Sequence, residues 1–304
     1  MLDVRRLRLL RELKIRGTLA GVAEALAYSP SAVSQQLEKL EKEAGVELLQ
    51  RVGRRVQLTP QAEILVEHTT HLLERLELAE AEMTASLTTV SGTVRVAVFQ
   101  SAAHAVIPQA LALLAAEFPE LRVEVTEREP ELGLFEVSAR DFDLVIAEQY
   151  PGHTRAHWSD LDRVDLAADM LRLAVPRRRT GRASAPTLEE AASLPWVMEP
   201  EGTASRQWAT QLCRSVGFEP DVRFETADLV AHIRLIESGN AVGILPDLVW
   251  AGAKPSVRLR ELPGQPHRTV FSAARRSSAS RPGVRAVRDA LARAVTRLET
   301  PPAA

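Results

Sequence analysis

A long segment without glycine or proline, from residue 61 to residue 86, divides this chain of 304 residues into two unlike parts. Thr59 and Pro60 precede it, and a threonine cap followed by proline at the first helical position is a common start of a helix. Apolar residues recur at intervals of seven along the segment, which predicts a helix with a narrow apolar seam that pairs with a second helix. We therefore expect residues 60–91 to be a linker helix and hinge through which two copies of the chain form a dimer. The seam consists of Leu65, Leu72, Leu76 and Met83.

The residues before this segment have the pattern of a helix-turn-helix. Apolar side chains at helical spacing predict a first helix over residues 4–15, which Gly17 ends. Thr18 is placed to cap a second short helix, and Ser29 followed by Pro30 starts a third. Two short helices around a tight turn are typical of this motif.

A basic hairpin is expected after the third helix. Residues 48–51 and 56–58 have the character of short strands, and the turn between them carries two arginines. Residues 1–60 hold 11 Lys and Arg against 7 Asp and Glu, whereas the remainder of the chain is net acidic, as expected for a nucleic-acid-binding head on another domain. Residues 1–59 are therefore predicted to be a winged helix-turn-helix that binds a double-stranded DNA operator.

The third helix presents short polar side chains at its N-terminal end. Its buried stripe of Val33, Leu37 and Leu40 leaves serines and a glutamine facing outward. Glutamine can bridge two atoms of adenine, serine can bond to several base edges, and the positive end of the helix dipole favours phosphate. An ordinary capped surface helix has the same pattern, but the basic hairpin and the long seam favour DNA recognition. The candidate DNA-binding residues are Ser29, Ser31, Ser34, Gln35, Arg51, Arg54 and Arg55.

The sequence pattern changes after a short linker at residues 88–92. Beyond it, short apolar runs alternate with amphipathic segments, which predicts an α/β domain with a largely parallel sheet. Strands are expected at residues 93–98, 121–127, 143–147, 171–175, 196–198 and 241–245, and helices at 101–116, 203–216, 227–238 and 284–298.

The run from Gly17 to Pro60 resembles the N-terminal domain of the LysR-type transcriptional regulators. Two positions depart from the family pattern: Ala62 stands where glycine is usual, and Leu49 stands where phenylalanine is frequent. Neither departure threatens the fold, because alanine favours a helix. The matching residues are Ala20, Ala23, Ala25, Ser31, Ser34, Gln35, Leu40, Glu41, Gly45, Val46, Leu48, Leu49, Arg51, Leu58 and Thr59.

This resemblance implies that residues 92–304 form an effector domain that folds like a periplasmic binding protein. Residues 92–163 and 268–304 would form one α/β subdomain, residues 164–266 would form the other, and a small-molecule effector would lie in the cleft between them. The resemblance further implies a homotetramer that assembles through the α/β domains. It implies no cofactor.

Helix starts that follow the predicted strands are expected to meet in this cleft, because ligands of open α/β sheets lie beyond the carboxyl ends of the strands. Hydroxyl and N–H groups there favour a carboxylate on the ligand, whereas Glu148 at the end of a buried strand would favour an amino group. The effector is then a zwitterion such as an amino acid or, if Glu148 faces solvent, a plain organic acid. Serine and threonine at helix starts are also ordinary caps. The candidate effector-binding residues are Gln100, Ser101, Glu148, Gly202, Thr203, Thr226 and Ile244.

The alternative hypothesis is a cytoplasmic solute-binding or enzymatic α/β protein with an accessory helical head. No catalytic motif supports an enzyme, and the N-terminus lacks the apolar core of a signal peptide that an exported binding protein would need. His68 and His71 have no third ligand nearby, so we predict no metal site. Cys213, the single cysteine, is interpreted as a packing residue rather than a redox sensor. Because no apolar stretch approaches about 20 residues, we expect a soluble cytoplasmic protein without a membrane partner.

Overall fold

The computed structural model describes residues 1–53, 55–87, 89–152, 158–177, 186–250 and 253–299. These residues belong to two compact units. The first unit comprises Met1–Thr88 with two short segments, Ala139–Asp141 and Ser277–Pro282. The second comprises Thr89–Ser138, Phe142–Arg276 and Gly283–Ala304.

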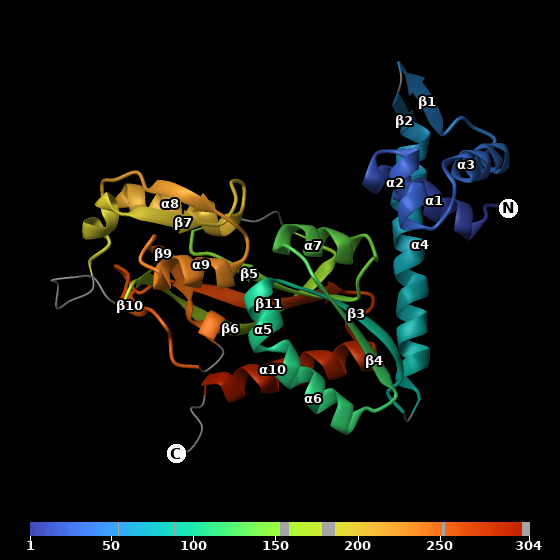
Figure 1. Cartoon of the computed structure of the whole chain (residues 1–304). Helices are drawn as coiled ribbons and strands as arrows, with labels where there is room; N and C mark the ends of the chain where they lie inside the picture. The colour runs from blue at the N-terminus through green and yellow to red at the C-terminus, as the bar shows by residue number, and fades with distance from the viewer. Residues whose placement is uncertain (54, 88, 153–157, 178–185, 251–252, 300–304) are drawn as a thin grey trace. The chain divides into compact units, whose positions relative to one another are not determined.

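The first unit contains three short helices, a two-stranded hairpin and a long helix (Figure 1). Asp3 and Ser29 cap the first and third helices through their side chains, and Gly17 ends the first helix with a φ of 72°. These are the local signals that helix ends require. The predicted helix-turn-helix and hairpin are confirmed. The elements are α1 (Val4–Arg16), α2 (Leu19–Ala25), α3 (Pro30–Ala44), β1 (Leu49–Val52), β2 (Arg55–Leu58) and α4 (Pro60–Ala85).

A continuous apolar core holds the three short helices against the start of α4. Leu10 from α1, Val22 from α2 and Leu37 from α3 are all buried in it. Ala62 is also fully buried there, which explains why a small side chain is needed where α4 meets the core. The hairpin pairs antiparallel with Leu49 opposite Leu58, and both leucines pack against the same core.

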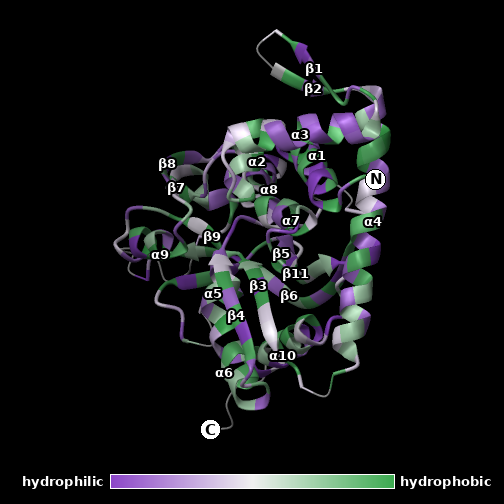
Figure 2. Ribbon diagram, turned by 90° about the vertical axis from the view of Figure 1, so that its right-hand side faces the viewer, coloured by the Kyte–Doolittle hydropathy of each residue, from purple (hydrophilic) through white to green (hydrophobic). Residues whose placement is uncertain are grey.

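The long helix α4 leaves much of its predicted seam open within the first unit. Leu65 is half-buried and packs against the core of the short helices. Leu72, Leu76 and Met83 are 39%, 46% and 73% exposed. Polar and apolar residues alternate along the ribbon of α4 in Figure 2. Among the residues that the structure describes, no helix combines the length and the apolarity needed to cross a membrane.

The second unit is built on a mixed sheet with the strand order β10-β6-β11-β5-β3-β4, to which β9 adds by pairing with β6. A smaller sheet pairs β7 with β8 in parallel. The strands are β3 (Gly92–Val98), β4 (Leu121–Glu127), β5 (Leu144–Gln149), β6 (Leu161–Val175), β7 (Pro195–Met198), β8 (Asp221–Glu225), β9 (Gly243–Pro246), β10 (Arg258–Glu261) and β11 (His267–Arg275). The helices are α5 (Gln100–Ala105), α6 (Ile107–Glu117), α7 (Pro130–Ser138), α8 (Ala204–Ser215), α9 (Leu229–Glu237) and α10 (Pro282–Glu299), with 3-10 turns at Glu189–Ser193 and Asp247–Trp250.

The expectation of a largely parallel sheet is wrong. Among the described strands of the large sheet, only the pairs β3–β4 and β3–β5 are parallel, whereas β11 pairs antiparallel with both β5 and β6. The reason is the path of the chain, which passes from one half of the domain to the other along β6 and returns along β11. The expected strand at residues 171–175 is the end of the 15-residue strand β6.

The single helix expected over residues 101–116 is also wrong, because the structure has two helices there. The helix α5 ends at Ala105, and α6 begins at Ile107 with Pro108 in its first turn. Proline has no backbone N–H and clashes with the preceding turn of a helix, so it favours a new start over a continuous helix.

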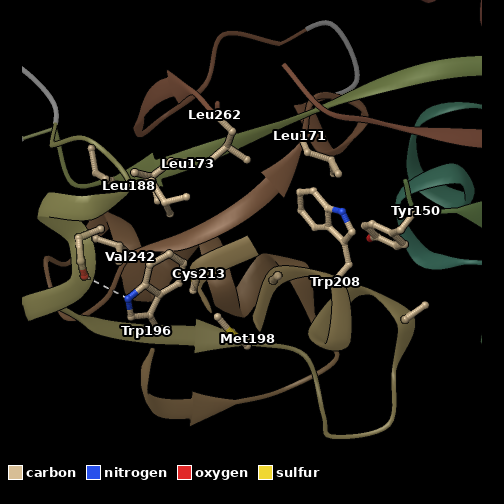
Figure 3. Close-up of a cluster of buried hydrophobic side chains, with 14 residues drawn as sticks. Tyr150, Leu171, Leu173, Leu188, Trp196, Met198, Trp208, Cys213, Val242 and Leu262 are labelled. Carbon is tan, nitrogen blue, oxygen red and sulfur yellow. Dashed lines mark hydrogen bonds between the residues drawn. The ribbon is translucent and has the colours of Figure 1, made fainter. Parts of the chain in front are cut away.

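Apolar clusters on both sides of the crossover strands form the core of the second unit. One contains Trp196, Trp208 and Cys213, with the Trp196 indole donating to the Ala191 carbonyl at 3.1 Å (Figure 3). Gly133 of α7 lies so close to the sheet that an added Cβ would be 2.8 Å from Val145. Glycine is therefore required where α7 packs on β5.

Candidate functional site

The N-terminal end of α3 carries an exposed group of short polar side chains. The Ser29 hydroxyl accepts from the Ala32 N–H at 3.2 Å, and the hydroxyls of Ser29 and Ser31 are 3.0 Å apart. Ser34 is half-buried and Gln35 is exposed. The predicted serines and glutamine therefore lie together at the first turns of one helix, where a major groove would meet them.

The predicted basic wing is formed by β1 and β2. Arg51 is exposed on β1. Arg55 belongs to β2 and pairs with Val52, but its side chain lies outside the described part of the structure, as does all of Arg54. The wing thus presents at least one exposed basic side chain, that of Arg51, and such a side chain can contact phosphate.

In the second unit, a buried arginine brings together side chains from three adjacent strands and a helix. Arg268 of β11 is 2% exposed. Its guanidinium bonds to Glu148 of β5, to Asp169 of β6 at 2.9 Å and to the Ser101 hydroxyl of α5 at 2.6 Å. Two predicted effector residues, Ser101 and Glu148, therefore meet at the same buried cation.

This cluster has more negative than positive charge. One guanidinium faces two carboxylates, and the pKa of Arg268 is raised because burial, which would lower it, is outweighed by the charges of Glu148, Tyr150 and Asp169. Burial raises the pKa of Asp169, and the attraction of Arg268 offsets that effect only in part. The charge of the cluster therefore does not favour the binding of a further anion.

Arg268 was missed at the level of sequence because strand β11 was not predicted. A signal was present: an arginine directly precedes the strand-like run Thr269–Ala274, whose apolar residues indicate burial on both faces. A buried arginine in such a run requires carboxylate partners.

The other predicted effector residues are more scattered. The side-chain amide oxygen of Gln100 accepts from the Leu229 N–H at 2.8 Å and so joins α5 to the start of α9. Thr203 caps α8, as predicted, and the preceding Gly202 is exposed with a φ of 93°. Thr226 directly precedes the helix expected at residues 227–238, and a cap at Thr226, which that position predicts, is wrong. The helix α9 begins later, and Asp228 caps it by accepting from the Val230 N–H.

A small cavity of about 30 Å³ lies beside this cluster. Tyr150 borders it, and of the predicted effector residues only Ile244 does so. Burial and the nearby charge of Glu148 raise the pKa of Glu199, another lining residue, to about 7. The remaining lining residues are Leu171, Val197, Met198, Ser205, Trp208, Ala209, Leu229, His232 and Pro246.

Cys213 is expected to be chemically inert in the folded protein. It is fully buried on α8, and burial raises the pKa of its thiol to about 12, so thiolate is scarce at neutral pH. A thiol reagent such as dithionitrobenzoate should therefore label the native protein far more slowly than the urea-unfolded protein. Equal labelling rates would contradict a packing role. Among the described residues, no group of His, Cys, Asp and Glu side chains is arranged to hold a metal ion.

A winged helix-turn-helix, a long helix and a two-part α/β domain with a polar internal cluster together define a ligand-responsive DNA-binding protein. Residues 4–63 match the family model of a bacterial regulatory helix-turn-helix protein of the lysR family, and residues 88–296 match the LysR substrate binding domain. The chain therefore belongs to the LysR family of transcriptional regulators, which confirms the resemblance seen in the sequence. It is a DNA-binding transcriptional regulator that a small-molecule effector modulates, and the alternative of a binding protein or enzyme with a helical head is not favoured.

Known relatives agree with this assignment, and solved structures share the fold. The transcriptional dual regulator GltC of Bacillus subtilis is 26% identical over 255 residues, 84% of each chain. A probable hydrogen peroxide-inducible genes activator of Mycobacterium avium is 29% identical, over 75% of this chain and 72% of that protein. The fold is similar to that of full-length OxyR from Pseudomonas aeruginosa, with a TM-score of 0.67 at 20% identity, covering 97% of this chain and 95% of that one. It is also similar to full-length BenM, with a TM-score of 0.57 at 18% identity over the whole of both chains.

Proposed function

We propose that the N-terminal end of α3 reads an operator in the major groove while the wing contacts the DNA backbone beside it. The observation that carries this proposal is the row of short polar side chains at the first turns of α3, where Ser29, Ser31 and Gln35 are exposed and Ser34 is half-buried. Side-chain amides and hydroxyls at that position suit base edges, whereas an arginine on the wing suits phosphate. We further propose that the protein works in the cytoplasm, where its operator lies, and that it catalyses no reaction.

We assign three functional segments to the chain. Residues 1–59 bind DNA, and residues 60–91 pair two copies and form the hinge. Residues 92–304 bind the effector, with one subdomain at 92–163 and 268–304 and the other at 164–266. In support of the last division, the two crossover strands β6 and β11 each lie at a proposed boundary.

We assign the effector to the space between the proposed subdomains at the cavity beside the Arg268 cluster, because elements of both proposed subdomains supply polar groups to that cluster. The pairing surface on α4 would join two copies, and contacts between α/β domains would complete a homotetramer. Binding of the effector would shift an equilibrium between assembly shapes by no more than its difference in affinity for them.

Peroxide sensing through a disulfide is not proposed for this chain, although some relatives carry names that refer to hydrogen peroxide. A disulfide within one chain needs two cysteines, and this sequence has only Cys213. Its buried thiol also lacks the low pKa of peroxide-reactive cysteines.

Gln35→Ala is expected to weaken binding to the operator by about 1–3 kcal/mol at one base-pair position while leaving binding to random DNA unchanged. The matched control is Arg51→Ala, which should weaken binding to all sequences and reduce the salt dependence by about one phosphate contact. Titrations of the full chain against DNA from its own upstream region, with each base pair substituted in turn, measure both effects. Equal losses on operator and random DNA for Gln35→Ala would remove this residue from base recognition.

A further inference from the structure

We propose that the cavity bordered by Glu199, His232, Tyr150 and Trp208 is the part of the effector site that binds a protonated amine. The effector would accordingly present an ammonium group to this cavity. This inference rests on the proposed effector function and specifies the chemical class of the ligand.

Two polar side chains that line the cavity, Glu199 and His232, offer hydrogen-bond acceptors. The His232 Nε2 lies 2.8 Å from the Thr226 carbonyl oxygen, and because a carbonyl only accepts, this nitrogen carries the proton. Burial lowers the pKa of His232, so the ring is neutral and its Nδ1 is an acceptor. His232 is 2% exposed, and within the described part of the chain its Nδ1 has no hydrogen-bond partner.

Glu199 supplies the second acceptor. The Ser205 hydroxyl donates to one of its carboxylate oxygens, and a carboxylate has about four acceptor positions, so others are left for a ligand. An ammonium group has three N–H donors and no acceptor. It therefore matches both Glu199 and the His232 Nδ1, whereas a carboxylate or a phosphate would match neither.

The charges around the cavity favour a cation in the same way. Arg268 is already engaged by Glu148 and Asp169, so the three groups together carry a net negative charge. An incoming anion would meet the carboxylate of Glu199, and no lysine or arginine is among the described residues that line the cavity. Like charges repel strongly in a buried site. Among the described residues, the charged or titratable groups around Glu199 include Glu129, Glu148, Tyr150, Arg206, Arg268 and His232.

The walls of the cavity suit an ammonium group with an apolar body. Tyr150 and Trp208 are both buried, and their ring centroids lie 5.6 Å apart at an interplanar angle of 33° (Figure 3). Aromatic faces attract cations, most strongly where water is excluded. Leu229 and Ile244 provide apolar contact for the first carbon atoms of the ligand.

The size of the cavity limits what enters it. A cavity needs about 10–15 Å³ of space for the centre of a water-sized sphere to hold one water molecule. At about 30 Å³ it accepts a group the size of ammonium or methylammonium, not an entire metabolite. The cavity is therefore the subsite for the head group of the effector.

The test uses three probes with one carbon skeleton: butylamine, butanol and butyrate. Each is titrated by calorimetry against the full chain at pH 6 and pH 8. Butylamine is expected to bind and the other two are not. Because the pKa of Glu199 is raised to about 7, this acid is mostly protonated at pH 6 and mostly ionised at pH 8. Amine affinity should consequently rise by about ten-fold between the two pH values.

Two variants test whether butylamine binding depends on Glu199 itself or only on the overall negative charge of the protein. Glu199→Gln keeps the shape of the side chain and should weaken butylamine binding by at least about ten-fold and abolish its pH dependence. Glu201→Gln removes an exposed acid from the same loop. It should leave the affinity for butylamine and the pH dependence of that affinity unchanged. Thermal unfolding of each variant shows that it is folded.

Operator binding is measured on the same preparations, so the two proposals fail separately. If the chain binds its operator but butyrate binds as well as butylamine, or no amine binds, or Glu199→Gln retains full amine affinity, the amine subsite is overturned and the regulatory function stands. If butylamine binds as described but no upstream DNA is bound, the DNA-reading function is wrong and the subsite stands.

Discussion

Replacement of both Leu72 and Leu76 by aspartate is expected to convert the protein to monomers and to weaken operator binding by at least about 100-fold. The two leucines are 39% and 46% exposed on α4, so in an isolated chain they place apolar surface in water. Pairing of two such helices buries this surface and holds two recognition helices for two half-sites. Without pairing through α4, the two DNA-binding heads bind their half-sites separately. The protein then loses the gain in operator affinity that a second, tethered binding event provides.

Light scattering after size-exclusion chromatography and a titration with operator DNA measure these two effects. The control is His71→Asp, which adds an acid beside the seam but on another face of α4, where the side chain is exposed. It should leave both the assembly and the affinity unchanged. A double leucine variant that still dimerises through the head and binds its operator normally would disprove pairing through α4.

Arg268→Met is expected to lower the free energy of unfolding by about 3–5 kcal/mol, because it leaves Glu148 and Asp169 buried without their cation. Urea unfolding followed by fluorescence measures the loss. Arg214→Met is a matched control, because Arg214 also pairs with a carboxylate but at the surface, 2.7 Å from Glu219. Exposed pairs contribute little, so this control should remain close to wild type.

The loss caused by Arg268→Met should also depend on pH. Burial raises the pKa of Asp169, and without the guanidinium that offsets this effect its pKa in the folded variant lies further above that of the unfolded chain. The folded variant then binds more protons than the unfolded one, so its stability falls as the pH rises. The difference from wild type is therefore largest near pH 8 and smaller near pH 5. A difference that does not change with pH would mean that lost packing, not unpaired charge, is responsible.

The N-terminal unit was predictable because its signals are local. Ser29 and Pro30 set the start of α3 by capping and by a fixed φ, and Gly17 sets the end of α1 through a left-handed backbone. The spacing of the leucines along α4 places them on one face whatever surrounds the helix. Each of these features depends on neighbours within a few residues, so the sequence alone indicates them.

The strand pattern was less predictable. Long crossover strands run through both halves of the domain. Their lengths follow from the pairing of β6 with β11, whose partner residues lie 97 to 114 positions apart in the chain. The sequence shows an apolar run at the end of β6, but no local pattern predicts a strand over the ten residues before it. In those ten residues, which positions are buried depends on the partner strand.

Of the residues in the proposed effector site, Ser101 and Glu148 were predicted from the sequence because each follows or ends a recognisable strand. Their shared partner, Arg268, was decided by the tertiary structure, since it lies 167 residues from Ser101 along the chain and meets it only when β11 inserts beside β5. The same holds for Glu199, which follows β7, and His232 of α9, because both side chains border one cavity although they are far apart in sequence. Helix caps and seams are set by short-range sterics and hydrogen bonds, whereas the charge of a buried site is a sum over groups that only the folded chain brings within a few ångströms of one another.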